Sequence, residues 1–186
     1  MKNKRICSAI LCAVMLLMLL PTAAGAADAN VVTDVSTVAE LRAVLENNAG
    51  AHVRLTKDIA FTTANAADRD IGVYLGEGCY TIDLNGFTLK YHYMTGGEFS
   101  DKGSPLASGK ARLLVINGPG SLIGGTHGLE QLDQFGTLIV NGGTFKGVMG
   151  FGIRMTGGII YMNGGTVTGN FGGIEHEDGI VILNGG

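Results

Sequence analysis

Three glycine-led triplets in the C-terminal half of the chain carry charged residues that could do chemistry together. The triplets are Gly128-Leu-Glu130, Gly152-Ile-Arg154 and Gly173-Ile-Glu175. If they stack in register, Glu130, Arg154 and Glu175 form an acid–base–acid column on one face. The two carboxylates would then lie roughly 9–10 Å apart, two strand spacings, near the upper limit for an acid and a base that admit a water molecule.

This column has two interpretations. Exposed ion pairs between neighbouring strands stabilise a sheet by only about 0–1 kcal/mol each, and such pairing is a purely structural role. Alternatively, Glu130, Arg154 and Glu175 form a sugar-binding or catalytic face. The sequence leaves both interpretations open.

A second charged cluster overlaps the end of this column. Glu175, Glu177 and Asp178 lie close together in the sequence, and their carboxylates could offer oxygen ligands to Ca²⁺. Their segment matches neither an EF-hand loop nor the Gly-Gly-x-Gly-x-Asp calcium repeat, so a solvated corner is the alternative. The four histidines show no metal-ligand spacing. We therefore expect no cofactor, with calcium at this cluster as the one exception.

Two tyrosines open a polar stretch at 90–111. Tyr91 and Tyr93 share a face at period two. Loops on a rigid scaffold often carry function, and paired rings can hold a sugar, so both tyrosines are candidate ligand contacts. The alternative is a strand end that covers neighbouring parts of the fold.

An internal repeat positions all of these residues. Asn-Gly follows a short apolar strand at five places, and the asparagines are spaced 32, 24, 22 and 21 residues apart. Chemically identical residues stack on one another in a solenoid. We therefore predict an amide ladder at one corner of the fold, made by Asn117, Asn141, Asn163 and Asn184.

Each late repeat of about 22 residues contains three short apolar segments separated by glycine corners. In one repeat these are 152–155, 159–162 and 166–168. Three such segments predict one triangular coil, and successive coils would stack at the strand spacing of about 4.8 Å. Antiparallel hairpins are the alternative, because Asn-Gly favours hairpin turns. The constant apolar phase of the repeats argues against hairpins.

The start of the repeat region is predicted to carry a cap. Thr37-Val-Ala-Glu40 is a capping-box pattern, and Val38, Leu41, Val44 and Leu45 follow on one helical face. We expect residues 27–50 to hold a helix that covers the first coil. Segments 52–55 and 58–61 then form the first strands of a β-helix over 51–186, which we expect to be truncated at its C-terminal end, since Gly186 falls in mid-coil.

The first 26 residues have the pattern of a secretory signal peptide. Lys2, Lys4 and Arg5 precede an apolar run, and Ala24-Gly-Ala26 follows as a cleavage site. Cleavage would leave Cys79 as the one cysteine, a net charge of −6 and no transmembrane span. We predict a secreted or cell-surface protein, and the acidic charge argues against a nucleic-acid partner.

The opening of the mature part resembles a known superfamily. The segments 38–45, 53–59 and 82–86 are similar to exported right-handed parallel β-helix proteins of the pectate-lyase-like superfamily, and the Asn-Gly-Gly-Thr coils resemble those of bacterial surface adhesins. The resemblance implies an all-β, right-handed parallel β-helix with an N-terminal capping helix. In pectate lyases an outward arginine abstracts a proton beside calcium-binding carboxylates, and Arg154 is the residue positioned for that analogy.

Three functions remain open at this point. The leading hypothesis is an adhesin-like module that binds a polysaccharide or a cell-surface glycan. The second is a polysaccharide lyase or glycoside hydrolase acting on an acidic polysaccharide, with Arg154, Glu130 and Glu175 in the site. The third is a structural stalk. Whether the protein is an enzyme, and its oligomeric state, are left undecided by the sequence.

Overall fold

The structure is a computed structural model that describes residues 31–62, 71–91, 94–95, 98–99, 103–108, 110–131 and 136–186. The predicted signal peptide (1–26) and Tyr93 lie outside these residues. In the described part, short strands predominate and α2 (Val38–Leu45) is the single helix. That part contains no helix with the length and apolar character needed to cross a bilayer.

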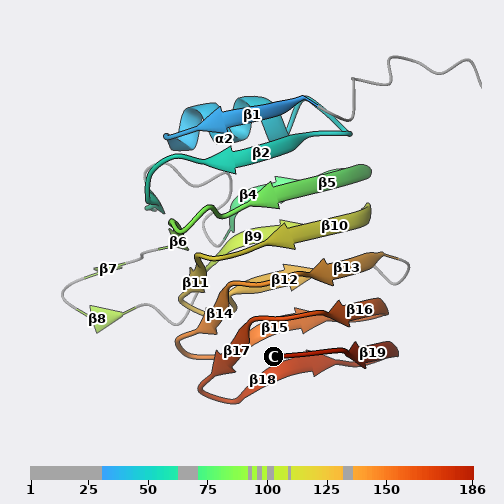
Figure 1. Cartoon of the computed structure of the whole chain (residues 1–186). Helices are drawn as coiled ribbons and strands as arrows, with labels where there is room; N and C mark the ends of the chain where they lie inside the picture. Colours follow the sequence, from blue (N-terminus) through green and yellow to red (C-terminus); the bar gives the residue numbers. More distant parts are fainter. Residues whose placement is uncertain are drawn as a thin grey trace, which may run out of the picture.

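Three parallel sheets form the body of the molecule (Figure 1). Sheet A contains β1 (Val32–Val35), β2 (His52–Leu55), β5 (Gly78–Asp83), β10 (Ala111–Asn117), β13 (Thr137–Val140), β16 (Gly158–Met162) and β19 (Gly179–Leu183). Sheet B contains β3 (Ile59–Phe61), β6 (Thr88–Tyr91), β11 (Ser121–Gly124), β14 (Thr144–Gly147) and β17 (Thr166–Gly169). Sheet C contains β4 (Ile71–Leu75), β9 (Ser104–Ser108), β12 (Leu129–Gln131), β15 (Phe151–Met155) and β18 (Gly172–His176).

The chain visits sheets A, B and C in turn, and each new strand pairs in parallel with its counterpart from the preceding round. This order is consistent with a parallel β-helix. Antiparallel pairing in the described residues occurs between β7 (Met94–Thr95) and β8 (Glu98–Phe99), which stand apart from the three sheets. The hairpin alternative is therefore wrong for the repeats.

Alternating side chains build the core between the sheets. In sheet A, Leu114, Leu138 and Ile160 occupy matching positions on neighbouring strands and are fully buried. In sheet B, Phe145 is buried in the same way while Lys146 points outward. This period-two alternation fixes which residues can reach solvent, and it leaves each sheet an outer face.

The four predicted asparagines lie in one column at the corner after sheet A. The amide nitrogen Nδ2 of Asn141 donates to Oδ1 of Asn117 at 2.9 Å, that of Asn163 donates to Asn141 at 2.9 Å, and that of Asn184 donates to Asn163 at 2.8 Å. This is the amide ladder that the repeat predicts.

The same column continues toward the N-terminus with charged residues. Asn117 is in register with Asp83, Asp83 with Arg54, and Arg54 with Asp34. Asn85, the asparagine of the first of the five Asn-Gly pairs, lies two residues beyond this column. Asn85 instead adopts a positive φ of 50° and donates from Nδ2 to the carbonyl of Leu55 at 3.0 Å.

Helix α2 lies over the N-terminal end of the coils (Figure 1). Thr37 is its N-cap and accepts from the backbone N–H of Glu40 at 3.2 Å, while the carboxylate of Glu40 accepts from the N–H of Ser36 at 2.7 Å. Leu41 and Leu45 are buried. The predicted helix is present, but strand β1 precedes it and pairs with β2, a strand that the sequence did not indicate.

Coil length varies mainly at one corner. The connections from sheet A to sheet B hold three or four residues throughout. The connections from sheet B to sheet C span 62–70, 92–103, 125–128, 148–150 and 170–171, so the first two are long and the later ones are short. The predicted polar loop at 90–111 belongs to this corner. Its predicted range was too long, because Ser104–Ser108 is a buried strand of sheet C.

Candidate binding face on sheet C

The predicted charged column lies on the outer face of sheet C. Glu130 of β12 is in register with Arg154 of β15, and Arg154 with Glu175 of β18. On the neighbouring inward positions, Leu129 and Ile153 are fully buried. The glycine alignment of the sequence therefore gives the correct register here, and it separates the charged side chains from the core.

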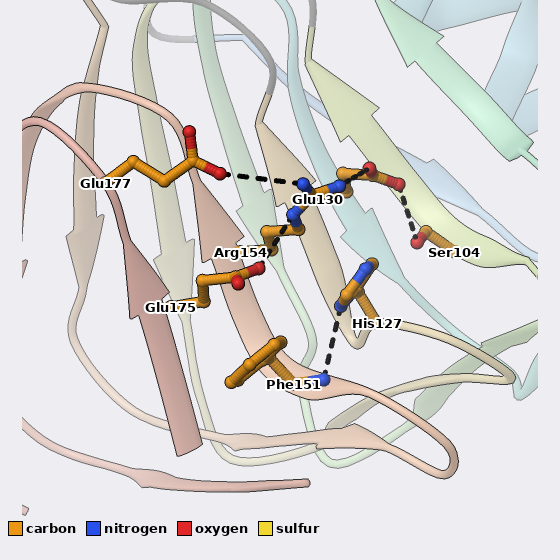
Figure 2. Close-up of polar contacts among 7 residues, drawn as sticks. All are labelled: Ser104, His127, Glu130, Phe151, Arg154, Glu175 and Glu177. Carbon is orange, nitrogen blue, oxygen red and sulfur yellow. Dashed lines mark hydrogen bonds and ion pairs between the residues drawn. The ribbon is translucent and has the colours of Figure 1, made fainter. Parts of the chain in front are cut away.

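Arg154 is held by three carboxylates (Figure 2). Its Nη1 donates to Glu130 Oε1 at 3.3 Å, its Nε lies 2.7 Å from Glu175 Oε2, and its Nη2 lies 3.7 Å from Glu177 Oε1. The Nε contact is an ion pair in which the N–H is not directed at the carboxylate oxygen. The side chains of Arg154 and Glu175 are about one-third exposed, at 33% and 32%, and therefore remain accessible to a ligand.

Two buried polar residues lie beside this column. Ser104 of β9 donates from Oγ to Glu130 Oε2 at 3.3 Å and is 1% exposed. His127 is also buried, and its Nδ1 accepts from the backbone N–H of Phe151 at 3.2 Å. An accepting Nδ1 places the proton of the neutral ring on Nε2. Burial lowers the pKa of His127 below its ordinary value. The nearby carboxylate of Glu130 acts in the opposite direction, but its effect is smaller.

Aromatic rings border the charged column. His127 stacks on Phe151 with ring centroids 6.0 Å apart, and Phe171 contacts Phe151 edge-on at 6.2 Å. Phe171 is 74% exposed. At the other end of the column, Ala107 of β9 is in register with Glu130 on one side and with Tyr74 of β4 on the other. Tyr74 is 42% exposed. Exposed rings thus lie on both sides of the ion pairs.

Several of these residues were missed by the sequence analysis. His127 and Phe151 immediately precede the glycines of the triplets that carry Glu130 and Arg154. Extending the same alignment by one residue would have predicted their stacking. Ser104 and Tyr74 carried no such signal, because the long connections of the early coils hide their register.

The other predicted ligand contacts are placed differently. Tyr91 is 3% exposed and stacks on Phe61 in the core, with centroids 6.5 Å apart. Its ring is therefore not available to a sugar, contrary to expectation. Period-two spacing shows that side chains share a face, but it does not show which face points inward.

The calcium candidates do not gather around one point. The carboxylates of Glu175 and Glu177 are directed at Arg154, as the two ion pairs above show. Among the residues that the structure describes, no group of three or more His, Cys, Asp or Glu side chains is arranged to hold a metal ion.

The position of Arg154 also bears on catalysis. An inverting glycosidase needs room for a water and a sugar between its two carboxyl groups. Here the guanidinium bridges Glu130 and Glu175 and occupies the space between them. For the same reason Arg154 is engaged by acids instead of directed at the open face, as proton abstraction would require. The arrangement offers hydrogen-bonding groups and ring surfaces for binding.

Comparison with known proteins adds no family assignment: no family model, no curated protein and no solved structure matches the chain.

Proposed function

We propose that this protein is an exported, right-handed parallel β-helix that binds a carbohydrate through the outer face of sheet C. The face comprises Tyr74, Glu130, Arg154, Phe171, Glu175 and Glu177. Its combination of charged hydrogen-bonding groups with exposed rings supports the proposal. Sugars present hydroxyls at their edges and C–H groups on their faces, which match such polar groups and rings respectively.

The charge of the face favours a neutral saccharide. Three carboxylates surround one guanidinium, so the local net charge is negative. A polyuronate would be repelled by this excess, whereas the carboxylate oxygens can accept hydrogen bonds from neutral hydroxyls. The resemblance to pectate-lyase-like proteins supports the export and the handedness of the coil, but the acidic face does not support their acidic substrates.

The test is binding to a panel of neutral and acidic polysaccharides, measured by affinity electrophoresis and calorimetry. Phe171→Ala removes the most exposed ring of the face, and we expect about ten-fold weaker binding to the neutral ligand. Tyr161→Ala on the outer face of sheet A is the matched control and should bind as the wild type does. Loss in both variants, or in neither, would argue against this face.

The enzyme hypothesis is tested on the same panel. A polysaccharide lyase would release unsaturated products, and a glycoside hydrolase would release reducing ends. Turnover that disappears in Arg154→Ala would overturn the binding-module proposal in favour of catalysis. Neither binding nor turnover by the wild type would leave the structural stalk as the function.

A further inference from the structure

The outer face of sheet B differs in chemistry from the face on sheet C. One outward column follows the solenoid axis through Thr88, Ser121, Thr144 and Thr166, all hydroxyl residues in register. A second column, two residues further along each strand, contains Ala60, Lys90, Ile123, Lys146 and Thr168. The face therefore combines hydroxyls with two lysines.

A groove lies across the first strands of this face. It has a volume of about 270 Å³ and is lined by Asp58, Ile59, Ala60, Thr88, Lys90 and Ile123. The carboxylate of Asp58 already accepts from the backbone N–H of Thr88 at 2.8 Å, so it is partly engaged within the protein. Ala60 and Ile123 flank Lys90 on the neighbouring strands and form an apolar floor beside its ammonium group.

Lys146 extends the charge beyond the groove. It is in register with Ile123, which is in register with Lys90. The two lysines are therefore two strand spacings apart, roughly 9–10 Å between their backbones. Lys146 is exposed and Lys90 partly buried. A chain molecule that follows the solenoid axis would meet both ammonium groups and the adjoining row of hydroxyls.

We propose that the outer face of sheet B binds an anionic saccharide, with its sulfate or carboxylate groups paired to Lys90 and Lys146. The hydroxyl column would donate to and accept from the sugar hydroxyls, and the apolar floor would contact the sugar's C–H face. This site is independent of the carbohydrate face on sheet C.

A nucleic acid fits this face less well. Single-stranded nucleic acids bind to grooves in which aromatic rings stack on the bases. Neither outward column of sheet B contains an aromatic residue among the described positions. Two lysines would also neutralise few phosphates.

The experiment uses three polymers with one backbone: dextran sulfate, carboxymethyl dextran and unmodified dextran. Binding to the full protein is measured by calorimetry at low and at moderate salt. We expect binding to a charged dextran that weakens as salt rises, and the two charged polymers distinguish sulfate from carboxylate recognition. Binding to neither charged polymer, or binding to a charged dextran that does not weaken as the salt concentration rises, would overturn the proposal.

Charge-removing variants locate the site. We expect Lys90→Gln and Lys146→Gln each to weaken binding by up to about five-fold and their combination to weaken it by about ten-fold or more. Lys110→Gln, an exposed lysine outside sheet B, is the matched control and should bind as the wild type does. Thermal unfolding confirms that the variants fold. A double variant with wild-type affinity would overturn the assignment.

Two further measurements separate the alternatives. Phe171→Ala should bind the charged dextran as the wild type does, because its ring belongs to the candidate face on sheet C. Weaker binding of the charged dextran by this variant would show that the two sites are not independent. Single-stranded DNA of matched charge should compete poorly. Tight DNA binding that is lost in the double lysine variant would overturn the saccharide assignment.

Discussion

One column of polar side chains runs along the corner of sheet A. Its N-terminal and C-terminal halves pair neighbouring side chains in different ways. In the N-terminal coils the column alternates in charge, through Asp34, Arg54 and Asp83. In the C-terminal coils it repeats one residue type, asparagine, with each amide donating to the next. A carboxylate only accepts hydrogen bonds and a guanidinium only donates them, so charged residues must alternate, whereas an amide does both.

This difference shows which hydrogen-bonding groups a column of stacked polar side chains needs. In a hydrogen-bonded column of polar side chains, one residue type can repeat from coil to coil only if its side chain carries both a donor and an acceptor. Where the coils vary in length, the column keeps its register but changes to opposite charges. The column on sheet C, Glu130–Arg154–Glu175, is a second alternating column that is better shielded from solvent than the pair of Asp34 with Arg54.

The largest effect is expected from Arg154→Met. Removing the guanidinium leaves Glu130, Glu175 and Glu177 close together without a cation, and the partly buried Glu130 keeps only the hydroxyl of Ser104 as a side-chain partner. We expect the free energy of unfolding to fall by about 2 kcal/mol at pH 7, measured by denaturant unfolding.

Arg112→Met is the matched control for this prediction. Arg112 pairs with Glu77 at a site where its side chain is 75% exposed, so its removal should leave stability within about 0.5 kcal/mol of the wild type. Equal losses for the two arginines would show that burial does not distinguish the charged column from a surface ion pair.

A smaller effect is expected from Asn141→Asp in the middle of the amide ladder. The carboxylate can still accept from Asn163, but it can no longer donate to Oδ1 of Asn117. We expect a loss of about 1 kcal/mol at pH 7, and a smaller loss at acid pH, where the protonated acid donates again. Asn170→Asp, at an exposed corner outside the column, should show no such pattern in the same unfolding measurement.

The smallest effect concerns the ion pair at the N-terminal end of the column. Arg54 donates to both carboxylate oxygens of Asp34, at 2.8 and 3.0 Å, and this hydrogen bonding holds the pKa of Asp34 below its ordinary value of 3.8. A carboxyl group whose pKa is lower in the folded state than in the unfolded state stabilises the fold at pH values above its unfolded-state pKa. This stabilisation is lost as the pH falls through the folded-state pKa.

The corresponding test compares Asp34→Asn with the wild type. The variant should be slightly less stable at neutral pH, and the difference should vanish as the pH falls below the ordinary range of an aspartate. Unfolding curves at several pH values below 5 measure it. A difference that persists at the lowest pH would assign the effect to packing instead of charge.

The success of the sequence analysis followed the regularity of the coils. Asn117, Asn141, Asn163 and Asn184 could be aligned because their spacing changes little, and the same regularity aligned Glu130 with Arg154 and Glu175. The first coils could not be aligned in this way, because their connections are long. The Asn-Gly pair at Asn85 lies two residues out of register with the later ones. Strand β9 was predicted as loop, and β1 was missed because the turn through α2 has no counterpart in later coils.

The candidate site could be predicted only in part for the same reason. A repeat reveals residues that occupy equivalent positions, so it revealed the charged column. It says nothing of residues brought beside that column from irregular coils, such as Ser104 and Tyr74. The burial of Tyr91 depends on which way its strand faces the core, and an isolated pair of tyrosines does not contain that information.

The connections from sheet B to sheet C vary in length, and this variation shows where the chain tolerates insertions. Length changes there leave the stacking of all three sheets intact, as the shortening from 92–103 to 170–171 demonstrates. The corner also adjoins the strands that begin with Phe151 and Gly172, beside the exposed rings. Insertions at this one position could therefore change the surface beside the rings while the scaffold stays constant, and the same position is the natural place to graft a foreign peptide.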